Sequence, residues 1–116
     1  MKKLILFLLP FCLVAETSFI TPKEYAAQLY KNPRGIGCNL CHGESGEGKI
    51  VAHYKHKNKD RLFAPPAINN LDFQTFYKAL NERKKGMPRY FLTQKEIKAL
   101  FLYVNTYQKD EAKDEE

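Results

Sequence analysis

Two cysteines and a histidine stand within five residues of the chain, as Cys38, Cys41 and His42. Two thiols at this spacing, on a tight turn that leads into a helix, can each add across one vinyl group of the same porphyrin. A histidine directly after the second cysteine can then bind the central iron as its proximal ligand. This C-x-x-C-H pattern is the sequence signature of covalent c-type haem attachment, so the three residues are candidate haem-binding residues.

The same two cysteines allow other chemistry. With His53 and His56 they form the pattern C-x2-C-x11-H-x2-H, which is close to the spacing of a zinc site. The last gap is one residue shorter than usual, and no hairpin pattern is visible in the chain between the cysteines and the histidines. A thioredoxin-like pair would need a βαβ setting, which is not visible, whereas a structural disulfide would suit a secreted protein. Zinc and a disulfide therefore stay open beside haem at this point.

The ends of the chain differ from its middle. Residues 1–15 predict a secretory signal, because Lys2 and Lys3 precede an apolar run over residues 4–14 and Ala15 is suited to cleavage. That run is shorter than the ~20 residues of a membrane-spanning helix. Residues 109–116 are rich in acids and predict a flexible tail. The 116 residues therefore support one domain over residues 16–108, exported to the periplasm.

Removal of the signal simplifies the set of sulfur side chains. Of three cysteines and two methionines, only Cys38, Cys41 and Met87 lie outside residues 1–15. No third thiol is then left to form incorrect disulfides in an oxidising compartment. Haem attachment to C-x-x-C-H also takes place outside the cytoplasm, so the signal and the motif agree.

Three segments show the apolar spacing of amphipathic helices, and these must position the motif. Two of them begin with a capping box, formed by Thr21 with Glu24 and by Thr93 with Glu96. The middle segment carries apolar side chains at helical spacing and is expected to stop at Gly86. The expected helices span residues 21–31, 70–85 and 93–108.

Two loops carry candidate ligands. Met87 precedes Pro88, and because the residue before a proline is pushed out of the helical region, Met87 is expected on an extended loop between two helices. With the haem motif upstream, it is a candidate second iron ligand. Pro65 and Pro66 stiffen an apolar segment that cannot be an interior helix and is expected to pack against a large apolar ligand or against the helices. The basic stretch over residues 49–61 has no assigned role.

Together these parts resemble a family. The haem motif after an N-terminal helix, Pro65-Pro66-Ala67-Ile68, Gly86-Met87-Pro88 and a capped closing helix are similar to the small bacterial monohaem class I cytochromes c. The resemblance covers roughly Thr21 to Tyr107. It implies an all-α fold, a cytochrome c-like bundle of three main helices with loops wrapped around one covalently bound haem c.

The resemblance also implies roles for single residues. The two cysteines of the motif would hold the porphyrin, and His42 and Met87 would be the axial iron ligands. Either Pro65 or Pro66 would offer its carbonyl oxygen to the second ring nitrogen of His42, which fixes the imidazole and tunes the iron. Ala26 and Tyr30 stand where the family often has a glycine and an aromatic residue at the crossing of the first and last helices.

The ligand set predicts the function. With both axial positions filled, no position remains for a substrate, so we expect a periplasmic electron carrier that passes single electrons between respiratory redox partners, and not an enzyme. A haem peroxidase or gas sensor with a displaceable sixth ligand is the alternative, and a structural zinc protein is a further one.

Charge bears on the partners. The chain has a formal net charge of +6, and basic residues gather on both sides of the expected haem pocket. Such a rim favours redox partners with acidic docking faces. Export disfavours nucleic acid, contact with a membrane is expected only through partner complexes, and the protein is expected to be a monomer. The basic residues are Lys55, Lys57, Lys59, Arg61, Arg83, Lys84, Lys85 and Arg89.

Overall fold

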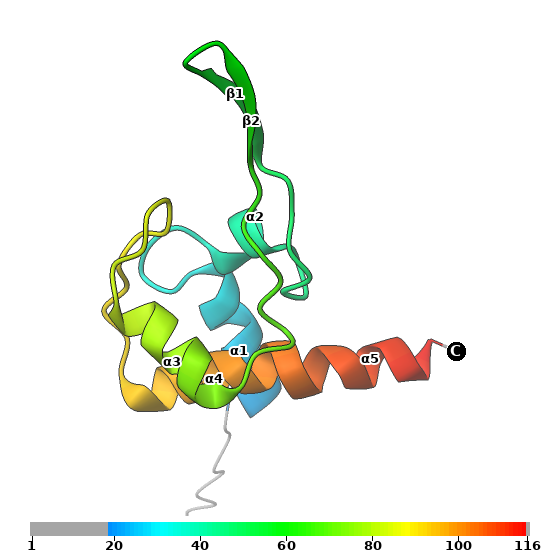
Figure 1. Cartoon of the computed structure of the whole chain (residues 1–116). Coiled ribbons are helices and arrows are strands. Elements are labelled where there is room, and N and C mark those ends of the chain that lie inside the picture. Colours follow the sequence, from blue (N-terminus) through cyan, green and yellow to red (C-terminus); the bar gives the residue numbers. More distant parts are fainter. Residues whose placement is uncertain (1–18, 116) are drawn as a thin grey trace, which may run out of the picture.

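The computed structural model describes residues 19–115, so the expected signal at residues 1–15 lies outside the described residues. Figure 1 shows a cluster of helices from which one hairpin and one helix extend. Within residues 19–115 no helix is long and apolar enough to cross a membrane. The elements are α1 (Pro22–Lys31), α2 (Cys38–His42), β1 (Ala52–His56), β2 (Lys59–Phe63), α3 (Phe73–Asn81), α4 (Gln94–Leu102), the π-helical segment η1 (Tyr103–Tyr107) and α5 (Gln108–Asp114).

The two predicted capping boxes are confirmed. The Thr21 hydroxyl accepts a hydrogen bond from the backbone N–H of Glu24 at 3.1 Å, and the Glu24 carboxylate accepts one from the N–H of Thr21 at 3.0 Å. Thr93 and Glu96 make the same pair of bonds at the start of α4. Each box satisfies two N–H groups that a helix start would otherwise leave free, so α1 and α4 begin where the sequence predicts.

The core lies where α1 crosses α4 and η1. Ala26 of α1 is fully buried there, and its small side chain lets α1 approach the other two elements closely. Tyr30 stacks on Tyr103 with ring centroids 4.9 Å apart, and α3 joins through Phe76, whose ring meets that of Phe101 edge to face at 5.5 Å. The expected crossing of the first and last helices is therefore present.

The middle helix is shorter than expected. It was predicted over residues 70–85, but α3 starts after Asp72, whose carboxylate accepts from the N–H of Thr75 at 2.8 Å, and it ends at Asn81. Gly86 is therefore not its stop and lies in the following loop. The physical reason is that residues 82–85 offer no apolar side chain to pack on α4, and packing sustains short helices more than propensity does.

The all-α expectation is wrong in one region. Residues 52–63, within and just beyond the basic stretch that had no assigned role, form an antiparallel hairpin in which Ala52 pairs with Phe63 and His56 with Lys59. Its two turn residues, Lys57 and Asn58, have φ angles of 51° and 62°, which suit a tight two-residue hairpin turn. Both strands are exposed on both faces apart from Phe63, so the sequence carries no alternation of apolar and polar residues. The expected three-helix bundle is thus only partly realised.

The C-terminal segment also differs from expectation. Residues 109–116 were expected to be a flexible tail, whereas the helix that starts at α4 continues through η1 and α5 to Asp114. No glycine or proline interrupts residues 93–116, and Glu111 makes an ion pair with Lys23 of α1. Figure 1 shows α5 extending past the other helices, and its residues are solvent-exposed apart from the first, Gln108.

Candidate functional site

One partly open cavity, here called the haem-site cavity, gathers every residue that the sequence marks for haem binding. Its volume is about 520 Å³, and its walls come from α2, the base of the hairpin, α3 and the loop between α3 and α4. Most of the lining is apolar, as expected of a site for a large apolar ligand. The predicted site residues on its wall are Cys38, Cys41, His42, Pro65, Pro66 and Met87.

The five-residue helix α2 places the cysteines and the histidine on this wall. Gly37 precedes it, and a Cβ atom there would meet the Lys31 carbonyl oxygen at 2.6 Å, so only glycine fits. Behind α2, the Tyr30 hydroxyl donates a buried hydrogen bond of 2.6 Å to the carbonyl oxygen of Gly43. Burial raises the pKa of Tyr30 well above its usual value, so the hydroxyl stays protonated as the donor. The core residue Tyr30 therefore fixes the end of α2 next to His42.

The His42 ring is oriented by a single contact. Its side chain is buried, and Nδ1 lies 2.8 Å from the carbonyl oxygen of Pro66. Because a carbonyl oxygen can only accept, Nδ1 must carry a proton, and in the neutral ring Nε2 then holds the free lone pair. Of the two prolines considered, Pro66 carries the carbonyl that faces His42. This tautomer is the one that a metal-binding histidine requires.

Both cysteines are free thiols that are half-buried against the cavity. Burial raises the pKa of the Cys38 thiol to about 11. The thiol is therefore held protonated beside the cavity and is not a reactive thiolate.

The zinc alternative does not fit the structure. His53 and His56 lie on the exposed strand β1, and because they are three positions apart they point to opposite faces of the hairpin. Among residues 19–115, no group of three or more histidine, cysteine, aspartate or glutamate side chains could hold a metal ion. The Cys38, Cys41, His53 and His56 spacing in the sequence is therefore not reproduced in space.

Met87 lies on the loop after α3, as expected. Its side chain is half-buried, packs against the core and lines the same cavity as His42. The preceding Gly86 has a φ of 83°, and a Cβ atom there would lie 2.8 Å from the Phe63 ring. A glycine at position 86 therefore lets the hairpin base close against the loop that carries Met87.

Two further residues support the site and were missed at the sequence level. The Tyr90 hydroxyl donates to the carbonyl oxygen of Ile36 at 2.6 Å, lines the cavity and has its pKa raised to about 12 by burial. Arg34 makes two hydrogen bonds of 2.8 Å to the Glu96 carboxylate and another to the Phe91 carbonyl oxygen. These hydrogen bonds connect the residues just before α2 to the chain that follows Met87. They join residues more than 50 positions apart, so no local pattern signals them.

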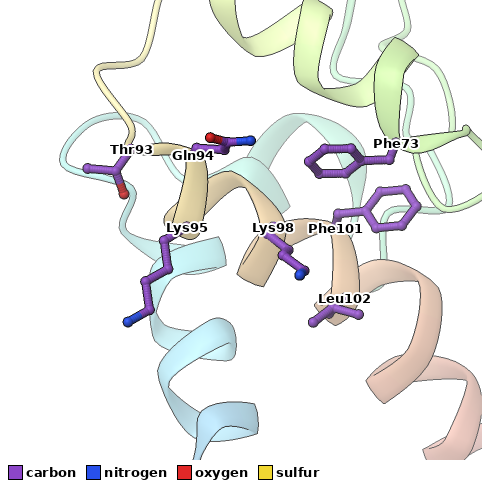
Figure 2. A pocket seen from close by; sticks show the side chains of 7 residues that line it. All are labelled: Phe73, Thr93, Gln94, Lys95, Lys98, Phe101 and Leu102. Carbon is purple, nitrogen blue, oxygen red and sulfur yellow. The ribbon is translucent and has the colours of Figure 1, made fainter.

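A second hollow lies beside α4 and is lined from α3 by Phe73. Figure 2 shows an open groove beside α4, with the rings of Phe73 and Phe101 at one end and the side chains of Lys95 and Lys98 along it. Its volume of about 760 Å³ exceeds that of the haem-site cavity, but no histidine, cysteine or methionine lines it. It offers neither an imidazole or thioether to bind a haem iron nor a thiol to attach the porphyrin.

The residues that line the haem-site cavity fit a haem. Two thiols, an imidazole with a free Nε2 lone pair and a thioether line one apolar space of suitable size. Cys38 and Cys41 would hold the group covalently, and His42 would bind its iron.

Comparison with known proteins identifies a family. A family model described as Cytochrome c matches residues 24–108, which is most of the chain and includes the whole cavity wall. The comparisons with curated proteins and with solved structures found no match. The chain therefore belongs to the cytochrome c family of haem-binding electron carriers, whose haem c is attached covalently.

Proposed function

We propose that this protein carries single electrons in the periplasm between respiratory redox partners, through one haem c ligated by His42 and Met87. The observation that supports this most is the 2.8 Å contact between His42 Nδ1 and the Pro66 carbonyl, because it leaves Nε2 free for iron. Met87 lines the same cavity and supplies the second ligand.

The chain has three tasks at this site: it holds the porphyrin, it orients the His42 ring and it excludes water. The haem supplies a reversible one-electron couple, and a histidine and methionine pair raises its reduction potential. Cys38 and Cys41 hold the porphyrin in place, and Pro66 keeps the His42 proton on Nδ1 throughout. The apolar wall, which includes Phe76 and Leu80, excludes water and so disfavours the more highly charged oxidised state.

The ligand proposal is tested by the Met87→Ala variant of the exported protein. The wild type should show a thioether-haem α-band and a weak methionine-to-iron charge-transfer band, and the variant should keep the first and lose the second. Leu71→Ala is the control, because Leu71 is also half-buried on the cavity wall but carries no ligand atom. Rapid binding of carbon monoxide by the wild type would instead favour the peroxidase or sensor function.

Location and partners belong to the same proposal. The pattern of residues 1–15 supports export, and a chain recovered from the periplasm that starts near residue 16 would establish cleavage. The basic residues near the cavity support acidic docking faces on the partners and a monomeric carrier. Sedimentation of the purified protein at several concentrations would test the monomer.

A further inference from the structure

The hairpin over residues 52–63 and the three residues that lead into it, together called the hairpin segment (residues 49–63), form the most conspicuous part of the molecule without an assigned role. Figure 1 shows it in green, standing away from the helices. Every residue of β1 and β2 except Phe63 is exposed. Because an isolated two-stranded hairpin is at best marginally stable in water, an exposed one of this kind gains stability when another surface covers it.

The base of the hairpin is fixed to the haem site. The N–H of Val51 donates to the Phe63 carbonyl oxygen at 2.8 Å, and Gly48 donates to the carbonyl oxygen of His42, also at 2.8 Å. Leu62 and Phe63 line the cavity itself. The hairpin is therefore held at the cavity and does not depend on a free linker for its position.

The positive charge of the molecule is concentrated in the hairpin segment and in the loop that carries Met87. The hairpin segment and the Met87 loop, residues 83–89, touch where Phe63 meets Gly86. Together these two segments hold nine of the 19 lysines and arginines but only one of the 13 acids. The rest of the chain has ten basic and twelve acidic residues, so its formal charge is negative. Within residues 19–115, no cation of either segment makes an ion pair.

The positions of the apolar residues in the hairpin segment distinguish a protein partner from a membrane. Ile50 and Leu62, which are 57% and 54% exposed, lie at its base, and Leu62 also lines the cavity. The tip, residues 56–59, contains only polar and basic side chains. A membrane-inserting hairpin would need apolar residues at its tip, whereas apolar residues near the centre with charges around them are typical of a protein interface.

A second copy of this chain fits the surface poorly. Two hairpins of the same positive charge repel each other, and lysines along a strand edge oppose pairing of strands between copies. The acidic helix α5 of another copy has no large apolar side chain to cover Ile50 and Leu62.

We propose that the hairpin segment and the Met87 loop form one docking surface for an acidic redox protein. The hairpin enters a recess of that partner, and an apolar patch of the partner covers Ile50 and Leu62. This rests on the proposed function and adds the element that selects the partner. Docking there brings the partner to the side of the cavity that Leu62, Phe63 and the Met87 loop line.

The test compares two charge-reversed variants of the haem-loaded protein. The hairpin variant carries Lys55→Glu, Lys57→Glu and Lys59→Glu, and its matched control carries three exposed lysine-to-glutamate changes on α4 and α5. The control positions are Lys95, Lys98 and Lys109, which lie outside both segments. Both variants have the same net charge and should keep the wild-type spectrum and melting temperature.

The probe is an acidic flavodoxin in its hydroquinone form. It gives one electron to the ferric protein, which becomes ferrous, and is itself left as the semiquinone. At an ionic strength of about 10 mM, the hairpin variant should react about ten-fold or more slowly than the control. A neutral hydroquinone should reduce both variants at the wild-type rate.

A second variant tests shape without reversing charge. Replacing residues 55–60 by Asn-Gly joins Tyr54 to its partner Arg61 through a two-residue turn and leaves the base of the hairpin in place. This shortened protein should keep the haem spectrum and react with flavodoxin as slowly as the hairpin variant.

Several results would overturn the proposal. Equal rates for the hairpin variant and its control would mean that only net charge matters. Hairpin-dependent binding to phosphatidylglycerol vesicles, with unchanged flavodoxin rates, would identify a membrane as the occupant, and hairpin-dependent dimers would identify a second copy. A wild-type protein without a haem α-band, or one that the neutral hydroquinone does not reduce, would instead remove the proposed function itself.

Discussion

At the scale of single residues, the site depends on hydrogen bonds that fix α2 from both sides. Pro66 holds the His42 ring from the cavity side, and Tyr30 holds the Gly43 carbonyl from the core side. The His42 ring therefore cannot rotate without losing the Pro66 hydrogen bond, and the backbone next to it cannot shift without losing the Tyr30 hydrogen bond. Loss of such supporting contacts typically costs about 10–100-fold in metal affinity or activity.

The hydrogen bond of Tyr30 predicts that the fold loses stability when the Tyr30 hydroxyl is removed. Tyr30→Phe leaves the buried Gly43 carbonyl with only the long 3.4 Å hydrogen bond from the Gly46 N–H, which should cost about 1–2 kcal/mol. Thermal melting of the haem-loaded protein measures this. Tyr25→Phe is the control, because Tyr25 is exposed. Equal melting temperatures for the two variants would show that the Tyr30 hydroxyl does not hold α2.

The Arg34 and Glu96 pair predicts a dependence on pH. The hydrogen bonds from Arg34 and from the Thr93 N–H lower the pKa of Glu96 from 4.5 to about 2. A carboxyl group with a lowered pKa stabilises the fold above pH 4.5 and loses that contribution as the pH falls toward 2. The melting temperature of the wild type should therefore fall more steeply over this range than that of Glu96→Gln.

The control for this pH dependence is Glu82→Gln, because Glu82 is more exposed and makes only a 3.8 Å contact with Lys78. This variant should follow the wild-type curve. Parallel curves for the wild type and Glu96→Gln would mean that the pair does not couple to folding.

At the scale of elements, the loop that carries Met87 is shaped by its contact with the hairpin. Phe63, at the end of β2, occupies the space that a side chain at position 86 would need. The early end of α3 leaves residues 82–86 to reach this contact as irregular chain. A short helix and a glycine together bring a thioether to the cavity that holds His42.

Gly86→Ala should therefore disturb both stability and ligation. The φ of 83° is strained for alanine, and the added Cβ atom would lie only 2.8 Å from the Phe63 ring, so a cost of about 1–3 kcal/mol is expected. Melting and the methionine-to-iron charge-transfer band measure the two effects. Gly35→Ala is the control, since a Cβ atom there meets only Tyr90 at 3.4 Å. An unchanged band and melting temperature in Gly86→Ala would contradict the packing described here.

At the scale of the whole molecule, the cavity is part of the core. The buried apolar residues of the described chain gather where α1, α3, α4 and η1 meet, and the cavity of about 520 Å³ lies next to them. A chain of about a hundred residues has little apolar surface to bury, so a large apolar group at the centre contributes much of what holds the fold together.

The protein without haem should then fold poorly. Cys38→Ser combined with Cys41→Ser removes the attachment points while changing little else in α2. This variant should show no cooperative melting transition by circular dichroism, unlike the haem-loaded wild type. The wild-type chain produced in the cytoplasm without residues 1–15 is a second test, because it keeps both thiols. A cooperative transition in either protein would mean that the helices fold without the haem.

The sequence by itself determined the features whose causes are local. The haem motif, both capping boxes and the loop position of Met87 each depend on residues within a few positions of one another, and the structure reproduces the two boxes and the loop. Hydrogen bonding between neighbours in the chain needs no knowledge of the fold.

Tertiary structure decided what depends on distant parts of the chain. Only the fold selects Pro66 over Pro65, pairs Arg34 with Glu96 and separates His53 and His56 from the cysteines. The hairpin escaped detection because its strands are exposed on both faces and so lack the alternation that a buried face imposes. Long-range contacts and solvent-exposed strands leave no local pattern, and for this reason the cavity wall and its projecting hairpin became visible only in three dimensions.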